Sequence, residues 1–162
     1  MTSAQESSWP QPRPEDVATF DGMIAAAYQA VSAQPGEERD LDRFRSLFRP
    51  DARLFNVTHS EEGGQTAILG LDDFVRGFSG VVTKGVFETE ISRRTERFGD
   101  IAHLWSTYEV RATAESPDVQ ARGINSMQLV WDGERWWIVS GMFQNEGPGL
   151  PMPEQYGGQG EV

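Results

Sequence analysis

The chain of 162 residues, 38% of them hydrophobic, is long enough to bury the core of one domain and is predicted to be globular. The absence of cysteine excludes disulfides and thiolate metal sites, and two histidines are too few for a histidine-rich zinc site. A formal net charge of −11 disfavours nucleic-acid binding, and the lack of a signal peptide or long apolar run predicts a cytoplasmic protein with no membrane partner.

The first part of the chain predicts helices. Residues 1–13 are polar and proline-rich and are expected to form a mobile N-terminal arm. A helix is then predicted over 14–31, where apolar residues recur at helical spacing at Val17, Phe20, Ile24, Tyr28 and Val31. A second helix is predicted over 40–49, because Asp40 can cap it and Pro50 ends it.

The rest of the chain predicts one more short helix among strands. Residues 70–78 have helical apolar spacing, and six runs have strand-like composition: 52–59, 66–69, 85–98, 101–113, 121–131 and 135–146. Polar connectors typical of hairpins separate the last four runs. Helices followed by an antiparallel meander predict a single α+β domain over 14–146, with its helices on one side of the sheet, and a Gly/Pro-rich tail over 147–162.

Four stretches of the chain resemble one superfamily. They are LFRPDARL (47–54), GLDDFVRGF (70–78), FGDIAHLWSTYEV (98–110) and the hairpin GINSMQLVWDGERWWIVS (123–140). Together they resemble the nuclear-transport-factor-2-like (NTF2-like) superfamily, which includes the SnoaL-like polyketide cyclases and ketosteroid isomerase. The resemblance implies a cystatin-like cone, in which three N-terminal helices pack on a curved antiparallel sheet around an apolar ligand pocket. It specifies the fold more than the function, because the superfamily holds enzymes, ligand binders and adaptor domains.

The adjacent residues Trp136 and Trp137 must point to opposite faces of the sheet. If Gly133 and Glu134 form the hairpin turn, one face carries Asn125, Met127, Leu129, Trp131, Trp136, Ile138, Ser140 and Met142. The resemblance makes this face the concave one. The outer face is then expected to carry His103, Trp105, Trp137, Val139 and Phe143. Since that face is too apolar for water, a homodimer through it is predicted, with cover by the tail or arm of a monomer as the alternative.

The pocket of the cone is expected to be lined by residues from the first helix and the strands: Tyr28, Phe55, His59, Asn125, Met127, Trp136 and Met142. Tyr28 could donate a hydrogen bond to a ligand oxygen, or bond to the backbone as a core tyrosine. Asn125 is costly to bury unpaired, which favours either a role in orienting a ligand or water, or a bond across the sheet. His59 ends the first strand and could act as a base near neutral pH, or lie exposed.

No catalytic residue, metal or cofactor is assigned from the sequence. The predicted inner positions hold no carboxylate, although ketosteroid isomerase chemistry needs a carboxylate base in an apolar site. Glu88 and Glu90 have charged neighbours and are interpreted as part of a solvated strand face. The predicted function is therefore the binding of a small apolar molecule in the pocket. A cofactor-independent isomerase, cyclase or dehydratase, or a dimeric interaction module without a ligand, are the alternatives.

Overall fold

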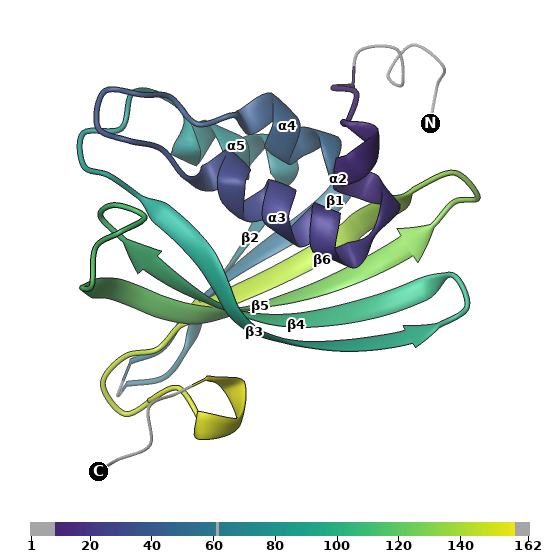
Figure 1. Ribbon diagram of the computed structural model, residues 1–162. Helices are drawn as coiled ribbons and strands as arrows, with labels where there is room; N and C mark the ends of the chain where they lie inside the picture. The colour runs from purple at the N-terminus through teal and green to yellow at the C-terminus, as the bar shows by residue number, and fades with distance from the viewer. Residues whose placement is uncertain (1–8, 61, 158–162) are drawn as a thin grey trace.

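The computed structural model describes residues 9–60 and 62–157, which form a layer of helices on one face of a curved sheet (Figure 1). The helices are α2 (Pro14–Ala18), α3 (Phe20–Val31), α4 (Leu41–Ser46) and α5 (Leu71–Phe78), and a short 3-10 helix, η1 (Glu154–Tyr156), lies near the C-terminus. The strands are β1 (Phe48–Thr58), β2 (Gln65–Gly70), β3 (Phe87–Phe98), β4 (Ile101–Arg111), β5 (Val119–Trp131) and β6 (Trp136–Asn145). No helix in these two ranges is long and apolar enough to cross a membrane.

The sheet has the strand order β2-β1-β6-β5-β4-β3. Neighbouring strands are antiparallel except for β1 and β6, which run parallel. This pair forms because β1 and β2 make a hairpin, α5 follows, and the meander of β3 to β6 then returns to the other edge of β1. The predicted α+β class is confirmed, and the sheet is mixed rather than wholly antiparallel.

The helix predicted over 14–31 is broken at Thr19 into α2 and α3. Thr19 has extended backbone angles (φ −138°, ψ 160°), and its hydroxyl accepts a hydrogen bond from the Gly22 amide at 3.0 Å, so it caps α3. A Cβ on Gly22 would lie 2.1 Å from the carbonyl oxygen of Glu15. Glycine at this position therefore allows α2 to fold back closely on α3.

The N-terminal segment packs on the domain from residue 9 onwards. The Trp9 indole N–H donates to the carbonyl oxygen of Phe48 at 3.1 Å, and the Arg45 guanidinium lies 4.8 Å from the Trp9 ring centre. Trp9, which belongs to the predicted arm, therefore contacts both α4 and β1. Residues 1–8 of that arm lie outside the described residues.

The two adjacent tryptophans are covered by different parts of the chain. Trp136 lies on the concave face and is buried, with its ring centre 4.8 Å from that of Phe20 on α3 and 5.6 Å from that of Trp131 on β5. Trp137 points to the outer face, where the Arg135 guanidinium lies 3.6 Å from its ring centre. The helices thus cover the first ring, and a cation covers part of the second.

The hairpin of β5 and β6 contains a bulge that exchanges the faces of its last residues. Leu129 pairs with Ile138 as predicted, but the register then shifts by one residue at Val139. Beyond the shift, Met142 points to the outer face and is 47% exposed, whereas Phe143 points to the concave face and packs against the core. The predicted faces of these two residues were wrong, because one extra residue in a strand turns every later side chain over.

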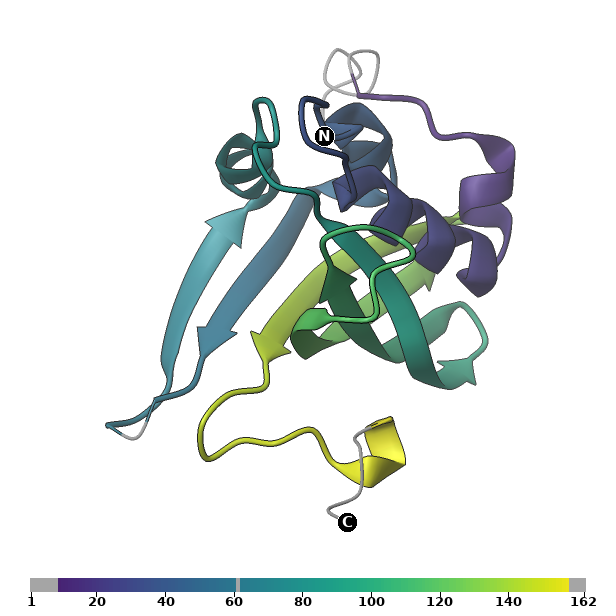
Figure 2. The same ribbon diagram turned by 60° about the vertical axis from the view of Figure 1, so that its left-hand side comes forward.

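Residues 147–157, here called the C-terminal strap, cross the outer face of the sheet on the side opposite the helices (Figures 1 and 2). The ring of Tyr156 lies 5.7 Å from that of Trp105, and the Arg94 guanidinium lies 4.9 Å from the same tyrosine ring. Met152 is only 8% exposed. The strap therefore covers Trp105 within one chain. Such cover by the tail was the alternative to a dimer that the sequence left open for the apolar outer face.

The other end of the outer face keeps an apolar row outside the strap. Phe98, Ile101, Val130 and Trp137 follow one another across the paired strands from β3 to β6, and Phe98 and Ile101 are 84% and 59% exposed. His103, on the same face, bonds to Ser126 through Nε2 and Oγ at 3.0 Å. The homodimer stays a prediction, and this apolar row is the surface that a second copy would bury.

We expect the chain to elute in size-exclusion chromatography at about twice its 18.1 kDa, and Ile101→Glu to elute as a monomer. A dimer would bury this row, so a charge at its centre would lack a partner and would disfavour association. Ile68→Glu is the matched control, because Ile68 is 65% exposed but lies on β2, away from the row. Elution of the unmodified chain as a monomer at micromolar concentration would contradict the dimer.

Candidate functional site

A cavity of about 200 Å³ lies between the helices and the concave face of the sheet, and is here called the inner cavity. Most of its wall is apolar, with contributions from α3, α4, α5 and the strands, such as Val31, Phe44, Leu54, Phe74, Met127 and Phe143. Its polar residues are Tyr28, Glu88, Tyr108, Asn125 and Asn145. A mostly apolar cavity with a few polar groups is typical of small-molecule sites.

A directed chain of hydrogen bonds leads from the inner cavity along the concave face to Glu90 on β3. The Asn125 amide Nδ2 donates to the Tyr28 hydroxyl at 3.1 Å, and that hydroxyl lies 2.8 Å from Ser106 Oγ. Ser106 in turn donates to the Glu90 carboxylate. Because Ser106 uses its proton on Glu90, its oxygen accepts the proton of Tyr28. Burial raises the pKa of Tyr28, so this phenol stays neutral and donates away from Asn125.

A second tyrosine is fixed at another part of the wall. The Tyr108 hydroxyl donates to Asn145 Oδ1 at 2.6 Å, and burial raises the pKa of this phenol too. A Cβ on Gly123 would lie 2.5 Å from the Tyr108 hydroxyl oxygen and 2.7 Å from Asn145 Oδ1. Glycine at position 123 therefore makes room for this hydrogen bond between β4 and β6.

Glu88 is the acidic group of the inner cavity. It lies on β3 opposite Val110, another wall residue, and its backbone N–H donates to Ser32 Oγ at 2.9 Å. Burial raises the pKa of its carboxyl group from 4.5 to about 7, against the opposing effect of the Arg39 cation. Its carboxylate makes no hydrogen bond to another residue of the described ranges. It is thus available to a bound molecule.

A second bulge explains why Glu88 and Glu90 face inward. Counted backwards from the hairpin turn, the pairing of β3 with β4 is regular from Phe98 to Ser92. It then shifts by one residue at Ile91, so that Glu90 lies opposite Tyr108. Without this shift both glutamates would lie on the outer face, which is the solvated face that the sequence predicted. That interpretation, and the prediction that the concave face has no carboxylate, were therefore wrong.

The two glutamates have different surroundings. The Glu90 carboxylate accepts from Ser106, and its Oε1 lies 3.4 Å from Nε of Arg93, which also pairs with Asp21. The Glu90 carboxylate is therefore paired with both the Ser106 hydroxyl and the Arg93 guanidinium. Glu88, two residues earlier on the strand, faces apolar wall residues instead. The raised pKa of Glu88 allows this residue to exchange a proton with a ligand near neutral pH.

The structure brings only some of the predicted pocket residues together. Tyr28, Asn125 and Met127 line the inner cavity, and Phe143, predicted for the outer face, lines it as well. Trp136 lies on the concave face but packs against Phe20 instead of lining the cavity.

Three predicted pocket residues lie elsewhere. Phe55 pairs with Met142 across β1 and β6, on the outer face. His59 follows the end of β1 and is exposed. The exposed position of His59 is the alternative that the sequence allowed. Phe55 was misjudged because strand alternation alone does not say which face of β1 is covered, and Met142 because the bulge in β6 turns it outward.

No metal site accompanies the inner cavity. Within residues 9–60 and 62–157, no group of three His, Cys, Asp or Glu side chains is arranged to hold a metal ion.

Comparisons with known proteins define the fold. No protein-family model and no curated protein matches this chain. An NTF2-like protein of unknown function from Pseudomonas putida has a TM-score of 0.58 at 13% identity, over 100% of this chain and 98% of its own. A protein of unknown function with a cystatin-like fold, from Nostoc punctiforme, has a TM-score of 0.57 at 15% identity, over 83% and 97% of the two chains.

A third solved structure carries a suggestion of activity for its own protein. It comes from Parabacteroides distasonis, is proposed to be a ketosteroid isomerase, and has a TM-score of 0.55 at 14% identity, over 83% of this chain and 98% of its own. The chain therefore has the NTF2-like, cystatin-like fold, which confirms the resemblance drawn from the sequence at the level of the fold. Identities this low carry no information on substrate.

Proposed function

We propose that the chain binds a small, mostly apolar molecule in the inner cavity, with a polar group of that molecule at Glu88. The observation that carries this proposal is a carboxyl group on an apolar wall without a hydrogen-bond partner among the described residues. Such a group is costly to bury unless something pairs with it. A ligand hydroxyl that donates to Glu88 would remove this cost.

The size of the cavity restricts the ligand. Its volume of about 200 Å³ is below the range of about 300–1,000 Å³ that is usual for drug-sized ligands. The wall offers apolar contacts on most sides, with Tyr28, Asn125 and the Tyr108–Asn145 pair as further polar groups. A single ring with one or two oxygen substituents fits this description.

The test uses 4-chlorophenol, an apolar ring with one hydroxyl donor, in isothermal titration calorimetry at pH 8. We expect Glu88→Gln to weaken binding about tenfold or more, because it replaces a hydrogen bond to a charged acceptor by a neutral one. Glu96→Gln is the matched control: it makes the same change on the same strand, at an exposed residue outside the cavity.

Ala27→Phe provides a second, independent test, because Ala27 lines the inner cavity and a larger side chain fills it. We expect this variant to lose 4-chlorophenol binding while its thermal unfolding remains cooperative. Equal affinities for the unmodified chain, Glu88→Gln and Ala27→Phe would contradict the proposal and favour a packed module that binds no ligand.

A second candidate function is proton transfer to or from the bound molecule without a cofactor, as in an isomerase, cyclase or dehydratase. The observation that favours it is the pKa of Glu88, raised by burial to about 7. A general base works best when its pKa is near the working pH. The Parabacteroides protein proposed to be a ketosteroid isomerase is in keeping with this reaction type.

A further inference from the structure

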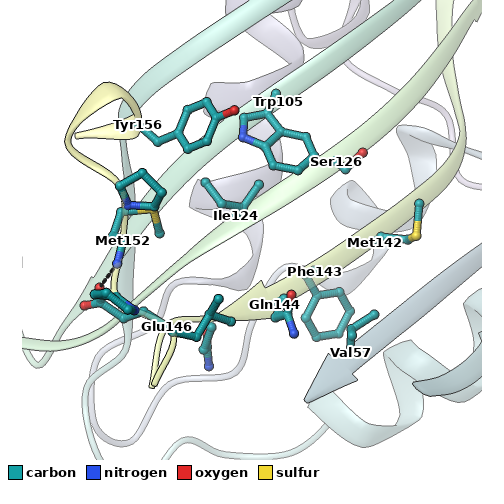
Figure 3. Close-up of a pocket in the computed structure, with 14 residues that line it drawn as sticks. Val57, Trp105, Ile124, Ser126, Met142, Phe143, Gln144, Glu146, Met152 and Tyr156 are labelled. Atoms are coloured by element: carbon teal, nitrogen blue, oxygen red, sulfur yellow. Dashed lines mark hydrogen bonds between the residues drawn. The ribbon is translucent and has the colours of Figure 1, made fainter. Parts of the chain in front are cut away.

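A second pocket, of about 350 Å³, lies on the opposite side of the sheet between the outer face and the C-terminal strap, and is here called the outer pocket (Figure 3). Its wall combines strand residues with strap residues, among them Trp105, Ile124, Met142, Leu150, Met152 and Tyr156. The volume lies within the usual range for small-molecule sites, about 300–1,000 Å³. The proposed function of the inner cavity does not involve this space.

The outer pocket contains a buried donor without a partner. The Trp105 indole nitrogen, Nε1, is buried and makes no hydrogen bond to any residue of the described ranges. The indole lies beside the Tyr156 ring, with its nitrogen on the edge that faces this ring (Figure 3). Since an indole N–H can only donate, a group that satisfies it must be an acceptor. Burying a donor without an acceptor is unfavourable.

Two other polar side chains around the outer pocket are already paired. Ser126 bonds to His103 at 3.0 Å, and Glu146 Oε2 accepts from the Met152 backbone N–H at 3.0 Å. The Glu146 carboxylate, together with the formal net charge of −11, disfavours an anionic guest. These observations favour a neutral molecule, apolar over most of its surface, with at least one hydrogen-bond acceptor.

The strap is attached at both ends of the outer pocket by a few hydrogen bonds. Just before its start, the Glu146 backbone N–H donates to the Arg122 carbonyl oxygen on β5 at 2.8 Å, and Gly147 and Leu150 bond to each other within the strap. Near its end, Arg94 Nη2 donates to Gln155 Oε1 at 3.2 Å. Gly149 has a φ of 77°, a conformation that favours glycine. Few hydrogen bonds therefore hold the strap over Trp105.

We propose that the outer pocket is a binding site for a neutral apolar molecule carrying a carbonyl acceptor, with the Trp105 indole N–H donating to that carbonyl. The site is separate from the inner cavity, because the two pockets lie on opposite faces of the sheet and share only Phe143 and Asn145 in their walls. It unites three features of the outer face: the apolar wall, the unpaired donor and the covering strap.

The test uses prodan, a neutral naphthalene with a ketone acceptor, whose fluorescence changes on entering an apolar site. We expect prodan to bind the full chain, and Trp105→Phe to weaken this binding about 2- to 12-fold, the loss expected for one hydrogen bond. Met142→Trp should abolish binding, because it fills the outer pocket from an exposed strand position. Ala27→Phe, which fills the inner cavity, is the matched control and should leave binding unchanged.

A second measurement covers the case in which a variant is poorly folded. In a ¹⁵N-labelled full chain, Trp105→Phe identifies the indole N–H signal of Trp105 by its disappearance. Prodan should shift that signal downfield in the unmodified chain, because a carbonyl then accepts its proton. Absence of prodan binding, binding that survives Met142→Trp, binding lost in Ala27→Phe, or an indole signal that does not move would each overturn the proposal.

Discussion

Glu88→Gln should raise the free energy of unfolding at pH 8 by up to about 3 kcal/mol and leave it nearly unchanged at pH 4.5. In the folded chain the pKa of Glu88 is about 7, against an ordinary value of 4.5. Between these values the folded state binds more protons than the unfolded state, so stability falls as pH rises from 4.5 to 7. A difference of about 2.5 pKa units corresponds to about 3 kcal/mol.

Urea unfolding of the two chains at several pH values between 4.5 and 8 measures this effect. Glutamine has nearly the shape of glutamate but no charge to bury, so the stability gained by the variant should grow as pH rises to about 7 and then remain constant. Glu96→Gln on the same strand, at an exposed position, should follow the unmodified chain at every pH. Parallel curves for Glu88→Gln and the unmodified chain would mean that the Glu88 carboxyl is solvated.

The sequence was sufficient to predict the elements and the fold because these depend on local patterns. Apolar spacing located the helical segments, and hairpin connectors located the meander. The break at Thr19 is a local feature that helical spacing alone does not reveal. It depends on a threonine cap and on Gly22, whose close approach to Glu15 is a tertiary contact.

The inner cavity was predicted only in part, and two bulges account for the largest errors. Tyr28 was found because it lies on a helix, and Asn125 and Met127 because the extra residue is on β6, so that the alternation along β5 is unbroken. The shift at Ile91 brought Glu88 into the cavity, and the shift at Val139 exchanged the faces of the residues after it. A hairpin turn sets the register only up to the first bulge, and neither bulge contains a glycine that would reveal it in the sequence.

The C-terminal strap shows a different limit of the sequence. Its Gly/Pro-rich composition has no helical or strand period, so it predicted a tail without a defined place. The position of the strap depends on single contacts, such as the packing of Tyr156 on Trp105 and the burial of Met152. These contacts join residues about fifty positions apart and leave no periodic signal.

The second large effect is expected in catalysis of proton exchange. If the inner cavity supports proton transfer, the full chain should accelerate the exchange of the α-hydrogens of cyclohexanone for deuterium in D₂O. In this step the Glu88 carboxylate takes a proton from the α-carbon, and the electron pair of the C–H bond moves into an enolate. The protonated Glu88 exchanges with D₂O and returns a deuteron to the same carbon, so the ketone is regenerated with deuterium.

The amide groups of the cavity can stabilise the enolate oxygen. Asn125 uses one amide N–H on Tyr28 and keeps the other, and Asn145 accepts from Tyr108 through its oxygen, which leaves its amide N–H groups as donors. Donors held in place in an apolar cavity favour the charge that develops in the transition state. Tyr28 takes no direct part, because its own proton is bonded to Ser106.

Proton NMR of the α-hydrogens measures the rate, corrected for exchange in buffer alone. Glu88→Gln should lower the protein-catalysed rate about 100-fold or more, the usual contribution of a positioned base, and Glu96→Gln should leave it unchanged. The rate of the unmodified chain should rise with pH and level off above about 7, since only the ionised Glu88 accepts a proton. Exchange that is not accelerated by the chain, together with 4-chlorophenol binding that depends on Glu88, would restrict the inner cavity to binding. Acceleration that persists in Glu88→Gln would mean that another group is the base.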